Sequence, residues 1–364
     1  MGSERNRPQR YRDEDDYGEY RVRSSKRPRT RRKRRIWPVL LAGCGIGILF
    51  TVLAATIVVF LTLRASQGSG SNLGSFVGIS NLGGIQTFTH EDKQPIALTT
   101  LTQMQICDTI GNVSILVDPT ATTAMVLTKK IVHANSQTDA NQEFQRIIVE
   151  VQPPGTITHP LTCTQTQPTT DAGSGLTVNV TLPNSDGLLH NTSNSVDVSI
   201  TLPPSALPSP NPSMQVDIDA PVGNVNIDGI TGLLKIKGST GNIQVTHTAL
   251  VDGSHIETGQ GNVTFNGQLV MPTITNEQAP EGYILQSEQG NINVTLPSDT
   301  NVVLDANTNV GSIKNEFDTS LKNTGTSGPA NYHGPLNTST SPPSLAQLVL
   351  DVSTGNVNIY KSQI

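Results

Sequence analysis

Histidines, cysteines and paired carboxylates are the side chains of this sequence that could do chemistry. The seven histidines stand singly, and none forms the His-Glu-x-x-His pattern that binds zinc. The sequence has neither the Gly-x-Ser-x-Gly turn of hydrolases nor a phosphate-binding loop. Asp217 and Asp219 lie two apart on an expected strand and could hold a cation or act as acid and base, but we interpret them as a solvated pair. We therefore predict no enzyme activity, no cofactor and no metal site.

Two of the three cysteines could form a disulfide. Cys44 falls within a long apolar segment, whereas Cys107 and Cys163 lie in the C-terminal region, which we expect outside the cell, where disulfides persist. We predict that Cys107 pairs with Cys163, and closing a loop of this size would stabilise the fold by roughly 4 kcal/mol in the chain-entropy model. Two separate buried thiols are the alternative. Two cysteines are too few for a cysteine zinc cluster.

A short repeated turn is the strongest internal signal in the chain. The pattern Gly-Asn-[Val/Ile]-x-[Val/Ile/Phe] begins first at Gly111, and a degenerate copy begins at Gly311. Glycine and asparagine tolerate positive φ and so form turns, while the two apolar residues that follow point to one face of a strand. Copies about 20 residues apart indicate a solenoid of stacked units. The stacked asparagines would either form a ladder or serve the turn alone. The predicted repeat turns are Gly223, Asn224, Gly241, Asn242, Gly261, Asn262, Gly290, Asn291, Gly355 and Asn356.

The region 96–364 is expected to be an all-β domain. Short alternating apolar and polar runs bounded by Gly, Pro, Asn or Ser are typical of strands with one buried face. One short helix is expected at residues 136–144. The first half repeats poorly and is followed by a Pro-rich stretch at 203–212. A sandwich-like first half joined to a solenoid second half is therefore an alternative to one continuous β-helix-like solenoid.

The repeat series resembles a known bacterial family. The segments that carry the resemblance are residues 240–243, 260–263, 289–292 and 354–357, preceded by 198–203. They are similar to the family of candidate bacterial adhesins, domains of unknown function with Gly-Asn-Val/Ile strand repeats, over about residues 101–360. The resemblance implies a β-repeat domain at the bacterial cell surface, often tethered to the membrane.

Residues 36–63 are apolar and uncharged, longer than the roughly 20 residues that a helix needs to cross a bilayer. We predict a transmembrane helix that serves as an uncleaved signal anchor. Residues 1–35 carry 14 Lys and Arg against 6 Asp and Glu, which predicts a disordered cytoplasmic tail whose basic run, 31–35, contacts membrane lipid. Gly43 and Gly47 would permit weak self-association through the span. Residues 64–95 are expected to form a Gly/Ser/Asn-rich linker.

Together these features predict a single-pass protein of the cell membrane with an extracellular β-repeat domain. Its expected function is adhesion or interaction with the cell envelope, without catalysis, through an unidentified surface ligand. The alternative is a sensor of envelope stress or of a ligand that signals through the basic tail. Nucleic-acid binding is disfavoured, because the chain after residue 35 holds only 10 Lys and Arg against 23 Asp and Glu. The few aromatic residues also argue against a deep, aromatic-lined carbohydrate cleft.

Overall fold

The computed structural model describes most of the C-terminal region of the chain. The described residues are 85–97, 100–154, 175–183, 194–208, 214–272, 280–317, 324–337 and 346–362. All of them belong to one compact unit, Asn81–Ile364. The tail predicted at 1–35, the span predicted at 36–63 and most of the linker predicted at 64–95 lie outside the described residues.

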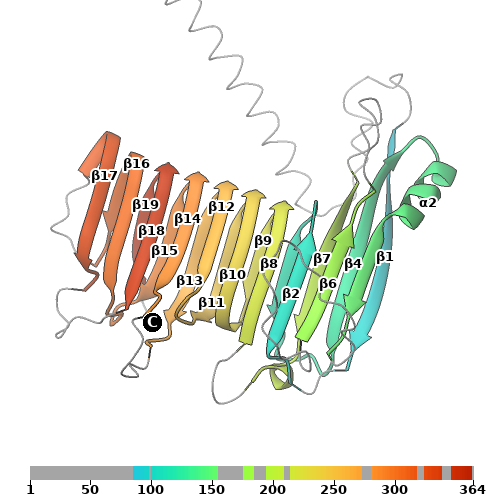
Figure 1. Cartoon of the computed structure of the whole chain (residues 1–364), viewed down its shortest axis with the longest axis horizontal. Helices are drawn as coiled ribbons and strands as arrows, with labels where there is room; N and C mark the ends of the chain where they lie inside the picture. Colours follow the sequence, from blue (N-terminus) through green and yellow to red (C-terminus); the bar gives the residue numbers. More distant parts are fainter. Residues whose placement is uncertain are drawn as a thin grey trace, which may run out of the picture. The chain divides into compact units, whose positions relative to one another are not determined.

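One stack of strands runs along the length of the unit (Figure 1). Its neighbouring strands are parallel, and we call it the first stack. In spatial order its members are β6 (Gly175–Thr181), β2 (Gln103–Asp108), β8 (Met214–Val222), β10 (Thr231–Thr240), β12 (His255–Gln260), β14 (Tyr283–Gln289), β18 (Gln347–Thr354) and β16 (Val303–Asn315). An antiparallel strand flanks each end: β5 (Ile148–Gln152) beside β6, and β17 (Thr324–Pro335) beside β16.

The second stack is also parallel. In spatial order its members are β7 (Ser195–Leu202), β3 (Val113–Val117), β9 (Val225–Asp228), β11 (Ile243–Leu250), β13 (Val263–Leu269), β15 (Ile292–Pro297) and β19 (Val357–Ser362). Beyond β7 come the antiparallel strands β4 (Ala124–Ala134) and β1 (Gln86–Ile96). The last residues of β16 pair with β19, so β16 belongs to both stacks.

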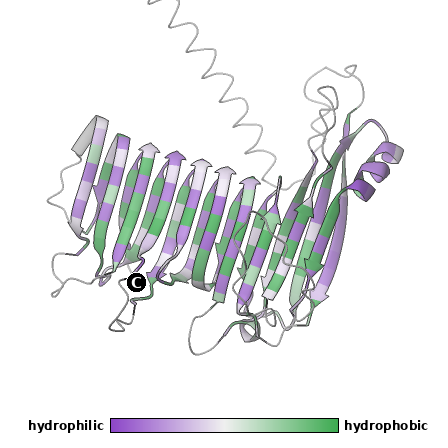
Figure 2. Cartoon of the chain, in the orientation of Figure 1, coloured by the Kyte–Doolittle hydropathy of each residue, from purple (hydrophilic) through white to green (hydrophobic). Residues whose placement is uncertain are grey.

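Each repeat contributes one strand to each stack. In the first regular repeat, β8 leads through Gly223 and Asn224 into β9, and the chain then returns to the first stack as β10. Along the strands of the regular repeats, burial alternates from one residue to the next, as in β8, where Met214 and Val216 are fully buried. Figure 2 shows this alternation as bands of hydrophobic and hydrophilic residues along the strands. Both stacks contribute to one hydrophobic cluster, which places the core between them.

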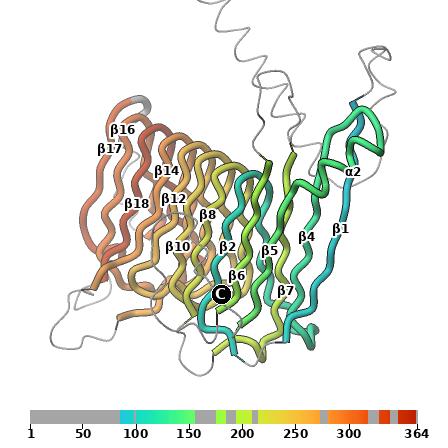
Figure 3. The backbone as a smooth tube through the Cα atoms, turned by 45° about the vertical axis from the view of Figure 1, so that its right-hand side comes forward, coloured from blue at the N-terminus to red at the C-terminus, as the bar shows by residue number. Residues whose placement is uncertain are grey.

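The first half of the domain is part of the same two stacks and does not form a separate sandwich. Strand β2 pairs with both β6 and β8, and β3 pairs with both β7 and β9. The described chain therefore begins at the outer edge with β1, enters the array at β2 and β3, passes back out to β4 and β5, and returns through β6 and β7 to continue with β8. At the other end, β18 and β19 insert between the β14–β15 repeat and β16 (Figure 3). The sandwich alternative is wrong, because the strands of the first half pair directly into the same two stacks as the regular repeats.

The helix content also corrects the expected fold class. The described residues contain one α-helix, α2 (Gln137–Arg146), at the expected place, and one short 3₁₀ helix, η2 (Pro204–Ala206). The Ser136 side chain caps α2 by accepting a hydrogen bond from the backbone N–H of Asp139 at 3.2 Å. Within the described part of the chain, no helix is long and apolar enough to cross a membrane. For the described residues, the expected fold class is therefore corrected to an all-β, β-helix-like unit without a transmembrane helix. Strand β1 also occupies residues that the sequence assigned to the end of the linker.

Candidate functional site

The glycines of the repeat turns are required by close packing between successive turns. A Cβ atom built on Gly261 would lie 1.9 Å from the carbonyl oxygen of Gly241, and one on Gly241 would lie 1.8 Å from that of Gly223. The same relation holds for Gly290 and Gly355. No side chain fits at such distances, so these glycines hold the turns in contact. Their role is structural.

The asparagines of the same turns form a continuous hydrogen-bonded ladder. Asn242 illustrates one rung: its Oδ1 accepts from the backbone N–H of Asn262 at 2.9 Å and from Nδ2 of Asn262 at 3.1 Å. Its own Nδ2 donates to Oδ1 of Asn224 at 3.3 Å. The sequence left a ladder and a simple turn as alternatives, and the structure shows the ladder. Its members in order are Asn112, Asn224, Asn242, Asn262, Asn291 and Asn356.

The two ends of the ladder carry side chains suited to ending it. At one end, Oδ1 of Asp197 accepts from the backbone N–H and from Nδ2 of Asn112, at 3.0 and 2.8 Å. A carboxylate only accepts, which is all that this end requires. At the other end, the Ser312 hydroxyl donates to Oδ1 of Asn356 at 2.8 Å. Because every rung donates in the same direction, the chain of dipoles has its positive end at Asp197, where the negative charge is favourable.

A buried acid lies near the Asp197 end of the ladder. Asp108 is 1% exposed, and burial, followed by the nearby charge of Asp197, raises its pKa to about 7. A backbone hydrogen bond from Ile110 opposes part of this rise in pKa. Asp108 is thus an acid that titrates near neutral pH but is shielded from solvent. Its depth makes it a determinant of stability and not a group that could meet a substrate.

The other residues that the sequence singled out are not gathered into one site. Cys107 is buried and disulfide-bonded; Cys163 lies outside the described residues, so the pairing of the two stays a prediction. On the outer face of the first stack, Asp217 and Asp219 stand beside Lys235 and Lys237 of β10. Burial raises the pKa of Asp217 above its usual range. Across the described residues, no group of three His, Cys, Asp or Glu side chains is placed to hold a metal ion.

The outer face of the second stack is different, because it is polar and nearly uncharged. Two rows of side chains cross its strands in register, and we call this surface the second-stack face. The first row consists of Ser199, Ser114, Asn226, Gln244, Thr264, Asn293 and Asn358. The second consists of Thr201, Leu116, Asp228, Thr246, Asn266, Thr295 and Tyr360. Adjacent strands place these groups about 4.7–4.9 Å apart.

Sequence reasoning missed this face, since polar residues on the outer side of a strand are common and their alignment appears only with the register. The first-stack face makes the contrast clear. There the aligned residues include Lys237 and Glu257, which form an ion pair at 3.5 Å.

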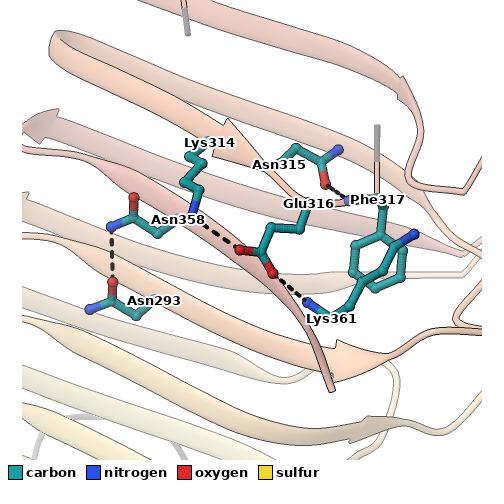
Figure 4. Close-up of polar contacts among 7 residues, drawn as sticks. All are labelled: Asn293, Lys314, Asn315, Glu316, Phe317, Asn358 and Lys361. Carbon is teal, nitrogen blue, oxygen red and sulfur yellow. Dashed lines mark hydrogen bonds and ion pairs between the residues drawn. The ribbon is translucent and has the colours of Figure 1, made fainter. Parts of the chain in front are cut away.

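Charged side chains mark the β16 end of the second-stack face (Figure 4). Within the second-stack face, Nδ2 of Asn358 donates a hydrogen bond to Oδ1 of Asn293 at 2.9 Å. At its border, Nζ of Lys314 donates to Glu316 at 3.0 Å, and the backbone N–H of Lys361 donates to the same carboxylate at 3.3 Å. The hydrogen bond from Lys314 is the main cause that lowers the pKa of Glu316. These charges are paired with one another and lie where the two polar rows end.

A pocket of about 340 Å³ lies at the C-terminal ends of the second-stack strands. It is lined by Thr231, His247, Thr248, Ala249, Asn266, Gly267, Gln268, Pro297 and Ser362. His247 is an extra residue of β11, inserted between Thr246 and Thr248 as a β-bulge against β13. Its φ of 50° is in the left-handed region, and among the described residues other than glycine no second one has positive φ.

The His247 side chain contacts an acidic neighbour. Its Nδ1 lies 2.6 Å from Oδ1 of Asp228, which also accepts from the Thr246 hydroxyl at 3.0 Å. The imidazole is largely exposed, with 77% of its side-chain surface accessible to solvent, whereas Asp228 is one third exposed. The arrangement orients an exposed imidazole at the rim of the pocket.

Comparisons with known proteins give only a weak likeness. No family model and no curated protein matches the chain. A solved structure described as a candidate cell adhesion protein from Clostridium sporogenes is 12% identical with a TM-score of 0.32, and the match covers 76% of this chain and 100% of that one. A candidate adhesin from Parabacteroides distasonis is 10% identical with a TM-score of 0.22, covering 76% and 97%. Likenesses this weak show nothing about the function of this chain.

Proposed function

We propose that this unit is a non-catalytic binding domain that adheres to a polar, uncharged polymer at a cell surface through the second-stack face. The aligned first row of amides and hydroxyls is the observation that carries the proposal. Amides and hydroxyls both donate and accept hydrogen bonds, as the hydroxyls of a polysaccharide do. An evenly spaced row can meet successive units of a repeating polymer, and many weak contacts then add up to firm attachment.

The repeat turns support this function by fixing the register. A polymer can be matched only if the row is rigid, and the asparagine ladder with its glycine contacts ties each repeat to the next. Paired charges at Glu316 limit the face at one end. The rows carry a single charged side chain, Asp228, and so offer no strong attraction to an ionic partner of either sign. We therefore favour a neutral ligand over a nucleic acid or a charged membrane surface.

Binding is favoured over catalysis because of where the titratable groups lie. Asp108 is the described carboxylic acid whose pKa is raised to near neutral, and it is 1% exposed. The disulfide at Cys107 supports a location outside the cell, where such bonds persist. The sensor alternative depends on residues 1–35, which lie outside the described residues, and no feature of the described unit favours it.

The proposal is tested by sedimenting the purified full-length chain with intact bacterial cells and with isolated cell-wall polysaccharide. An unrelated protein of similar net charge serves as the control. We expect saturable pelleting that persists at high salt, because contacts between uncharged groups are not screened. A chain that stays in the supernatant with every surface, or that is released by salt, would contradict the proposal.

A further inference from the structure

We propose that the pocket beside His247 is a subsite for one neutral sugar unit of the adhered polymer. This inference deepens the proposed function and rests on it. The volume of about 340 Å³ is at the small end of the range for ligand pockets, which suits a single sugar ring. The pocket opens at the ends of the strands that carry the two polar rows, so one polymer can reach both.

The chemistry of the lining favours a polyhydroxylated ligand. Thr231 and Ser362 supply hydroxyls, while Asn266 and Gln268 supply amides. Ala249 and Pro297 add a small carbon surface of the kind that the C–H face of a sugar can contact. Together these groups offer several donors and acceptors around a confined space, which is the requirement for holding neighbouring hydroxyl groups.

Charge and ring content exclude the other common ligand classes. Among the described residues, no Lys or Arg lines the pocket, and the carboxylate of Asp228 lies next to it, so an anionic sugar or a phosphate is disfavoured. A single carboxylate is too few ligands for a metal ion. The described lining also contains no Phe, Tyr or Trp, so it gives a nucleobase no stacking platform. A neutral, polyhydroxylated ligand such as a sugar fits these groups best.

The backbone at His247 is the independent sign of a built site. Two nearby positions are glycines: Gly229 directly follows the end of β9, and Gly267 on β13 pairs with Thr248. A glycine would relieve the left-handed conformation at residue 247, yet the chain has histidine there. Bulges re-aim side chains, and strained residues cluster at ligand sites. Here the bulge places an imidazole at the pocket rim, where Asp228 orients it through Nδ1 and Nε2 is the nitrogen left to contact a hydroxyl group.

The test is ligand-observed NMR on the full-length chain. The probes are glucose, galactose, mannose and N-acetylglucosamine, with glucuronate as the charged comparison. We expect saturable binding of at least one neutral sugar and none of glucuronate. His247→Gly and Asn266→Ala should each weaken that binding at least tenfold. His255→Ala is the matched control, because His255 is also partly exposed but lies on the first stack. It should bind as the wild type does.

Two measurements keep the result decisive. His247→Gly should melt at or above the wild-type temperature, since glycine suits a φ of 50°; binding lost from a folded chain then identifies the pocket. The subsite is refuted if no neutral sugar binds, if glucuronate binds equally well, or if the two pocket variants bind normally. If the wild type still pellets with wall polysaccharide in that case, the proposed adhesion stands without the subsite. If the wild type does not pellet at all, the adhesion proposal itself fails.

Discussion

The asparagine ladder predicts that an inner rung contributes more to stability than an end rung. Asn242→Ala removes three hydrogen bonds: one that its Nδ2 donates to Asn224 and two that its Oδ1 accepts from Asn262. Each such bond contributes about 0.5–1.5 kcal/mol net, and the low end applies because the turn is exposed and water replaces part of what is lost. At about 0.5 kcal/mol for each of the three bonds, we expect the free energy of unfolding to fall by about 1.5 kcal/mol. Ser312→Ala removes one side-chain bond and should cost about 0.5–1 kcal/mol.

Urea unfolding of the full-length chain, followed by circular dichroism, measures the difference. Gln244→Ala is the control, since Gln244 is exposed on β11, the strand that directly follows Asn242, and lies outside the ladder. It should change the free energy of unfolding by no more than about 0.5 kcal/mol. Equal effects for the inner-rung, end-rung and control substitutions would refute the reasoning. The ladder would then be a geometric consequence of stacking and not a source of stability.

Three further predictions follow from the described contacts. Gly261→Ala would place its Cβ 1.9 Å from the carbonyl oxygen of Gly241, so we expect a loss of about 3 kcal/mol or more, seen as a lower urea midpoint. The pKa of Asp108 is about 7 in the folded state, against 3.8 for an ordinary Asp. Between these two values the folded state retains a proton that the unfolded state releases. The free energy of unfolding should therefore fall by about 2–3 kcal/mol from pH 5 to pH 8. Asp108→Asn should flatten that slope in urea titrations at the two pH values, and an unchanged slope would assign it to other groups. His247→Gly should leave the free energy of unfolding unchanged or raise it by about 1 kcal/mol. The reason is that relief of the left-handed backbone offsets the loss of an exposed contact with Asp228. A fall of about 2 kcal/mol or more in the same urea titrations would contradict the presence of backbone strain at residue 247.

The regular repeats could be predicted from local chemistry, because their turns and strands depend on short segments. Gly223 and Asn224 are adjacent in sequence and form the turn that their residue types favour. The alternating residues of β8 likewise alternate between core and solvent. These features need no knowledge of distant parts of the chain.

The ends of the array and the candidate site depend on long-range pairing. The local sequence of β2 does not show that the strand lies between β6 and β8, because its parallel partners are more than 70 residues away along the chain. The bulge at His247 is invisible in sequence, since it exists only relative to the register of β13. The pocket brings together residues from five strands, from Thr231 to Ser362, and none of them has an unusual local signature.

The most direct test of the account compares two charge-matched double variants in sedimentation with cell-wall polysaccharide. Asn226→Asp with Gln244→Glu adds two negative charges and removes amide donors from the first row of the second-stack face. Lys235→Gln with Gln286→Glu makes the same change in net charge on the first stack. The account predicts that the second-stack variant loses at least tenfold in affinity while the first-stack variant binds like the wild type. Equal binding by the two variants, or a loss confined to the first-stack variant, would contradict the assignment of the binding surface.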